Sequence, residues 1–166
     1  MSVIFEYFWV ADRTAAVEWA IGPGGDWLGE RPGDEAGVDW FDVKRIDADV
    51  VLGKLVAFAD TGLLDRGAAP RLIWPDPDEV PRPHETYPLA GTAWDTGLIL
   101  EEIPETWRDA LAGIGEDAVP MLALQWCDID EMSFDYEGAA ECVRDFAGLA
   151  RRARAAGAQL YCRFGA

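Results

Sequence analysis

The segment from Trp126 to Gly138 is the part of the sequence richest in groups that could do chemistry. It holds five carboxylates, those of Asp128, Asp130, Glu131, Asp135 and Glu137. Closely spaced carboxylate oxygens suit Ca²⁺ and Mg²⁺, and an EF-hand loop needs acidic or amide ligands at positions 1, 3 and 5 and a glutamate at position 12. Counted from Asp128, position 5 is Met132 and position 12 is Ala139, so the EF-hand pattern fails.

Two other interpretations of this segment stay open. A looser cation site on Asp128, Asp130 and Asp135 would need only oxygen ligands. The simpler interpretation is that Asp135 and Glu137 begin a helix, where negative charge is favoured, and that the other acids form a solvated turn. We therefore predict neither a metal nor a cofactor.

Few residues of the chain could form a zinc site or act as a serine nucleophile. The chain has one histidine, His84, and three widely spaced cysteines, Cys127, Cys142 and Cys162. This set lacks the paired spacing of zinc sites and redox motifs. Ser2 and Ser133 are the only serines, and neither lies in a Gly-x-Ser-x-Gly elbow. We predict no catalytic residue from these types.

One arrangement could still form a small-molecule site. His84 and Glu85 lie in a proline-rich segment, and Cys127 and Asp128 follow the apolar segment 119–126. If the two segments converged, these four residues would line a pocket. A small enzyme or ligand-binding domain of unknown substrate is therefore the alternative function.

Charge gives the strongest indication of function. The chain of 166 residues carries 31 acidic and 14 basic residues, a net charge of −17. Such a charge repels nucleic acid and anionic membranes and attracts basic surfaces. Because no signal peptide and no membrane-spanning apolar run is present, we predict a cytoplasmic protein. The absence of asparagine and the preference for arginine over lysine are typical of a GC-rich bacterial genome.

The sequence predicts a binding surface of acids and aromatics for a basic protein partner, in the manner of an immunity or inhibitor protein. Its carboxylates would steer the partner and its tryptophans would supply desolvated contacts. The predicted residues are Asp76, Asp78, Glu79, His84, Glu85, Trp94, Trp126, Asp128, Asp130 and Glu131. Trp126 also fits a core position because it lies in an apolar segment. A homodimer joined through exposed aromatics is a further alternative.

The periodicity of the apolar residues and the positions of glycine, proline and capping residues predict the elements that would position these residues. Strands are expected at 3–10, 71–74, 98–100, 119–126 and 159–164, and helices at 12–20, 50–59, 105–112 and 136–156. Asp12 and one of Asp47 and Asp49 are the expected helix caps. The pattern predicts one α+β domain over residues 1–166, with three to four helices packed on a mixed sheet.

Two stretches carry a resemblance to known proteins. The segment Asp42 to Gly53, before the second expected helix, and Leu160 to Cys162, in the last strand, resemble a group of short acidic bacterial proteins. The order of elements is also similar to that of YfbM-like proteins, which begin with a strand and a short helix and end with a helix and a strand. The resemblance implies an α+β fold and brings no active-site residue with it.

Overall fold

Five antiparallel strands form the centre of the protein. The computed structural model describes residues 3–26, 37–60, 67–79 and 90–165. Its sheet has the order β2-β1-β5-β4-β3, and every neighbouring pair of strands is antiparallel. The strands are β1 (Ile4–Val10), β2 (Trp40–Lys44), β3 (Arg71–Trp74), β4 (Leu98–Glu102) and β5 (Gln159–Gly165).

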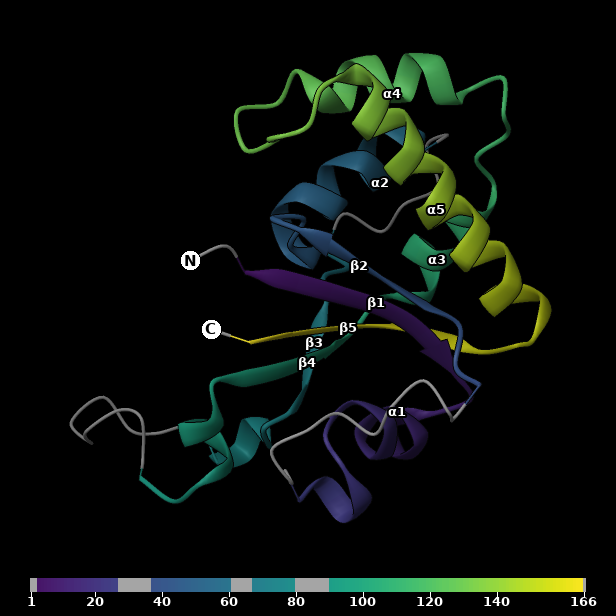
Figure 1. Cartoon of the computed structure of the whole chain (residues 1–166). Coiled ribbons are helices and arrows are strands. Elements are labelled where there is room, and N and C mark those ends of the chain that lie inside the picture. The colour runs from purple at the N-terminus through teal and green to yellow at the C-terminus, as the bar shows by residue number, and fades with distance from the viewer. Residues whose placement is uncertain (1–2, 27–36, 61–66, 80–89, 166) are drawn as a thin grey trace.

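Helices cover both faces of this sheet. They are α1 (Arg13–Ala20), α2 (Gly53–Ala59), α3 (Glu105–Ala112), α4 (Val119–Cys127) and α5 (Tyr136–Ala155). Short turns accompany them: η1 (Pro23–Gly25), the π-helical η3 (Ala48–Leu52), η4 (Pro77–Glu79) and η5 (Ala93–Thr96). Figure 1 shows α1 on one side of the sheet and α2, α3, α4 and α5 on the other. No helix in the described ranges is both long and apolar enough to span a membrane.

The alternation of side chains in β1 explains why this strand lies inside the sheet. Phe5 and Tyr7 point into the larger core, which the sheet forms with α2, α3, α4 and α5. Phe8 points to the other face, where it packs on Trp19 of α1 with ring centroids 4.3 Å apart. Because successive side chains of a strand alternate between faces, apolar residues at both parities require cover on both faces. The strand expected at 3–10 is thus confirmed, and it is covered on both faces.

Aspartate side chains cap three of the helical segments, and an ion pair joins α1 to the sheet. Asp12, Asp47 and Asp135 each accept a hydrogen bond from a backbone N–H three residues later, at 2.7 to 2.9 Å. Such a cap contributes about 1 kcal/mol. Arg13 of α1 donates to both carboxylate oxygens of Glu102 in β4, at 2.7 and 2.8 Å. The expected caps Asp12 and Asp47 are confirmed.

The structure differs from the expectations from sequence in four respects. The fold is α+β as expected, but the sheet is antiparallel and not mixed, and the described residues form five α-helices, not three or four. The segment 119–126 is helix α4 and not a strand. β2 was not expected, although it is the edge strand beside β1.

Candidate protein-binding surface

The acidic segment after α4 is a turn whose carboxylates have separate roles. Asp135 caps α5 by accepting from the backbone N–H of Gly138 at 2.9 Å. Glu131 accepts from Lys54 of α2 at 2.5 Å. The ammonium group of Lys54 lowers the pKa of Glu131 by this hydrogen bond. In the described part of the chain, no group of three potential metal ligands gathers here or elsewhere.

Asp128 and Asp130 are the two carboxylates of this turn that project freely. Both are exposed, and Asp128 is the residue that ends α4. Neither forms an ion pair with a described residue. Their charges are therefore available to a partner.

Trp126 does not belong to this surface, which corrects the sequence prediction. Its side chain is fully buried, and its indole Nε1 donates to the carbonyl oxygen of Val51 at 2.8 Å. The reason is the helical period of α4, which places Val119, Leu122, Ala123 and Trp126 on the side that faces the core. Trp126 is an anchor between α4 and the turn before α2.

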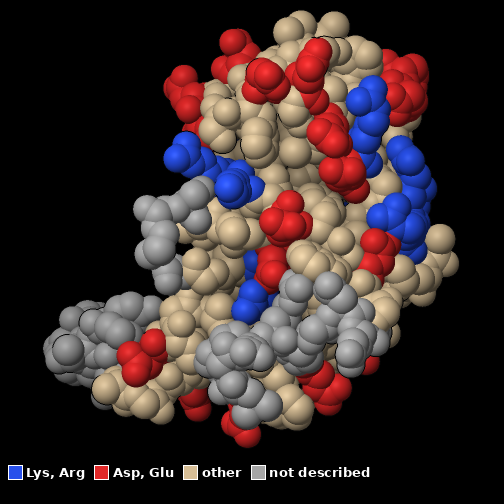
Figure 2. Space-filling view, in the orientation of Figure 1, with Lys and Arg blue, Asp and Glu red and all other residues tan. Residues whose placement is uncertain are grey.

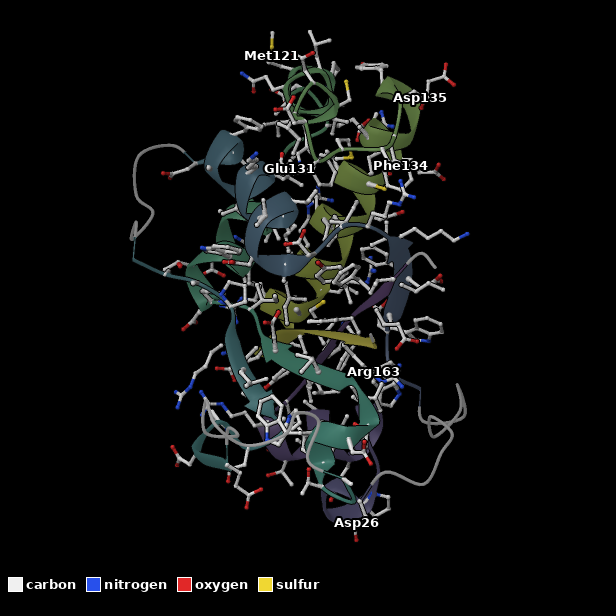
Figure 3. The ribbon with its side chains drawn as sticks, turned by 90° about the vertical axis from the view of Figure 1, so that its left-hand side faces the viewer. Asp26, Met121, Glu131, Phe134, Asp135 and Arg163 are labelled. Atoms are coloured by element: carbon white, nitrogen blue, oxygen red, sulfur yellow. The ribbon has the colours of Figure 1, made fainter. Side chains whose placement is uncertain are left out.

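The outer side of α4 presents aliphatic residues instead. Met121 is 60% exposed and Leu124 is 56% exposed. Figure 3 shows Met121 pointing away from the molecule at its α4 end, while Glu131 lies toward α2. We call Met121, Leu124, Asp128 and Asp130 the α4 face. It combines apolar area with unpaired negative charge, the composition of a protein contact.

Three further predicted acids lie at the other end of the molecule. Asp76, Asp78 and Glu79 are exposed in and beside η4, just after β3. Figure 1 shows that this segment and α4 occupy opposite ends. Asp76 also accepts a hydrogen bond from the backbone N–H of Asp78 at 2.9 Å, which stabilises the local turn. The single predicted surface is therefore two separate acidic regions.

Other predicted site residues do not join the α4 face. Trp94 is partly buried in η5. His84 and Glu85 lie outside the described residues, so the predicted pocket of His84 with Cys127 and Asp128 stays a prediction. Cys127 itself belongs to α4, where its thiol donates to the carbonyl oxygen of Leu124 at 3.4 Å.

The sequence analysis did not predict a cavity of about 680 Å³, open to solvent, that η3, α2, residues 67–69 and one side chain of α3 line. Its lining includes Val50, Gly53, Lys54, Asp60 and Trp107. A Cβ at Gly53 would lie 3.0 Å from the ring of Trp107, so a larger residue would fit there only if the ring moved by a few tenths of an ångström. No motif marks this cavity, since residues that are apart in the sequence line it only after α2 and α3 pack together.

The pKa of the Cys142 thiol is sensitive to the negative charges beside it on α5. Burial, together with the neighbouring carboxylates of Asp145 and Glu141, raises the pKa of its thiol to about 11. We expect the double variant Glu141→Gln/Asp145→Asn to lower this pKa and to speed alkylation of Cys142 several-fold at pH 8.5, because the thiolate is the reactive form. Mass spectrometry of the Cys142 peptide after iodoacetamide treatment measures the rate.

The double variant Asp128→Asn/Asp130→Asn is the control for this experiment, since it removes the same charge from a different surface. It should leave the alkylation rate of Cys142 unchanged. Equal rates in the wild type and in the Glu141/Asp145 variant would mean that these carboxylates do not act on the thiol.

Comparison with known proteins finds no relative of this chain. No protein-family model, no curated protein and no solved structure matches the chain. The resemblance to short acidic bacterial proteins therefore stays a prediction, and the function has to be argued from the surface itself.

Proposed function

We propose that this protein binds a basic protein partner through the α4 face, as an immunity or inhibitor protein does. The observation that carries the proposal is that two aliphatic side chains of α4, Met121 and Leu124, are exposed, and that the turn directly after this helix carries the exposed carboxylates of Asp128 and Asp130. The 76–79 region offers charge, but no large exposed hydrophobic residue accompanies it among the described residues. The α4 face is thus the better candidate of the two.

The two kinds of residue would contribute to binding in different ways. Burying a large aliphatic side chain at an interface contributes on the order of 1.5 to 3 kcal/mol. The net charge of −17 and the two aspartates would accelerate the approach of a cationic partner, and salt would weaken this effect. We therefore expect Met121 and Leu124 to determine mainly the dissociation rate, and the two aspartates to determine mainly the association rate.

The test begins with the tagged protein purified from the cells that express it, in parallel with the variant Met121→Ser/Leu124→Ser. We expect a basic protein to be retained at low salt by the wild type and lost from the variant. With the purified partner, the variant should weaken the dissociation constant at least tenfold, mainly through faster dissociation. Surface plasmon resonance measures both rates.

Two matched charge variants test the steering part of the proposal. Asp128→Asn/Asp130→Asn should slow association a few-fold at low salt and flatten its salt dependence. Asp78→Asn/Glu79→Gln removes the same charge from the opposite end and should have a much smaller effect. The α4 face would be the wrong surface if retention survived the Met121/Leu124 change, or if only the second charge variant slowed association.

A further inference from the structure

The outer edge of β2 carries backbone groups that the sheet leaves unpaired. β2 is the last strand on its side, and no strand in the described residues lies beyond it. Its ladder with β1 joins Arg45 to Val3 and Asp39 to Trp9, so the odd-numbered residues of β2 point their backbone groups toward β1. The N–H and C=O groups of Asp42 and Lys44 therefore point to the outer edge. Such an edge is a template for another strand.

A groove of about 330 Å³ runs along this edge. One wall is Asp42, Val43 and Lys44 of β2, and the other is the first half of α5, with Phe134, Gly138, Glu141, Cys142 and Asp145. Figure 3 shows Phe134 beside the start of α5, at one end of this groove. An extended chain that paired with β2 would place every second side chain against α5, because side chains alternate along a strand.

The negative charges on the α5 side of the groove determine which side chains a bound strand should carry. Glu141 and Asp145 are exposed, and neither has an ion pair within 4 Å to a described residue. Burial raises the pKa of Asp145, and the charge of Glu141 raises it further, while the charge of Arg152 lowers it and leaves the pKa above its usual value. Arg152, farther along α5, is bonded to Asp39. In Figure 2 a line of acidic side chains descends over the region where Figure 1 draws α5. A cation in the groove would relieve this repulsion.

We propose that the β2 edge binds an extended basic segment of a partner protein, which adds to the sheet as a sixth strand and places alternate lysines or arginines against Glu141 and Asp145. Backbone hydrogen bonds would supply affinity, and the alternate basic side chains would supply specificity. A second copy of this chain is the less suitable occupant, because two molecules of net charge −17 repel each other. The β2 edge is a different surface from the α4 face, so either proposal can fail without the other.

A fluorescein-labelled six-residue peptide of alternating lysine and threonine tests this inference by fluorescence anisotropy. Lys44→Pro removes an N–H that points to the free edge, while the ladder to β1 keeps its hydrogen bonds. We expect this variant to bind the peptide at least tenfold more weakly than Lys44→Ala, which removes the same charge and keeps the N–H. A peptide N-methylated at alternate residues should bind the wild type at least tenfold more weakly as well.

A second pair of measurements keeps the test decisive if the proline variant is unstable. Glu141→Gln/Asp145→Asn changes two exposed side chains, and it should weaken peptide binding about tenfold at low salt and flatten the salt dependence. Equal binding of the N-methylated peptide would overturn the proposal, because it would show charge attraction without strand pairing. Failure to bind up to ~1 mM peptide would overturn it too, as would a concentration-dependent dimer in light scattering that Lys44→Pro abolishes.

Discussion

Replacing Trp126 with alanine should destabilise the protein by about 3 to 5 kcal/mol, the largest effect that we expect from any single substitution. The side chain is fully buried, it packs edge to face on Phe146 with ring centroids 6.2 Å apart, and its indole donates to Val51 at 2.8 Å. The substitution leaves a cavity between α4 and α5 and removes the hydrogen bond from the indole to Val51. Chemical denaturation measures the free energy of unfolding, and thermal unfolding should show a midpoint lowered by about 10 °C.

Met121→Ala is the matched control, since it shortens a large side chain on the same helix. Met121 is 60% exposed, so the change should alter the free energy of unfolding by no more than about 0.5 kcal/mol. Trp126→Phe should fall between the two, because it loses the hydrogen bond to Val51 and fills most of the cavity. If Trp126→Ala kept its stability and weakened partner binding instead, the original assignment of Trp126 to the binding surface would be restored.

Arg108→Ala should destabilise the protein by about 2 to 4 kcal/mol, the second largest effect. Arg108 is buried in α3 and donates to the carbonyl oxygen of Ala158, just before β5, at 2.7 Å. The same guanidinium donates to Glu105 at 2.9 Å and to Asp109 at 2.8 Å. Its removal leaves a buried carbonyl without a donor and separates α3 from the chain that enters β5. Urea denaturation at neutral pH measures the loss.

An exposed arginine provides the comparison for Arg108. Arg144 of α5 pairs with Glu116 at 2.7 Å, and both side chains are more than half exposed. Arg144→Ala should therefore cost less than about 1 kcal/mol. Equal losses for the two variants would show that the bond from Arg108 to Ala158 does not hold α3 to the sheet.

The sequence predicted those elements whose polar and apolar residues follow one clear period. α1, α3, α5 and the two terminal strands lie within one or two residues of their expected bounds, because caps, glycines and a one-sided apolar stripe mark them. α4 was wrongly expected to be a strand. Its buried residues repeat with the helical period, but the exposed Met121 and Leu124 fill the gaps between them. A short continuous apolar run does not distinguish a strand from a helix.

This failure and the candidate surface have the same cause. A helix at the surface of a soluble protein normally has polar residues on its outer side. Helix α4 has aliphatic residues there, so its sequence shows no clear helical period. The same residues leave apolar area exposed in the folded protein. The groove beside β2 was missed for a different reason. Neither β2 nor α5 carries a motif for it, and the wall formed by Glu141 and Asp145 faces Val43 only after the sheet and helix have packed.

The arrangement of the sheet also constrains when the protein can fold. β1 and β5 pair at its centre over the register from Phe5↔Phe164 to Val10↔Gln159, so its first and last strands are neighbours. Figure 1 accordingly shows the N and C labels close together. A nascent chain that still lacks β5 can form only the separate pairs β1 with β2 and β3 with β4. Completion of the sheet therefore has to wait until β5 has been synthesised and has left the ribosome exit tunnel, and the many pairings between distant parts of the chain predict slow folding from that moment.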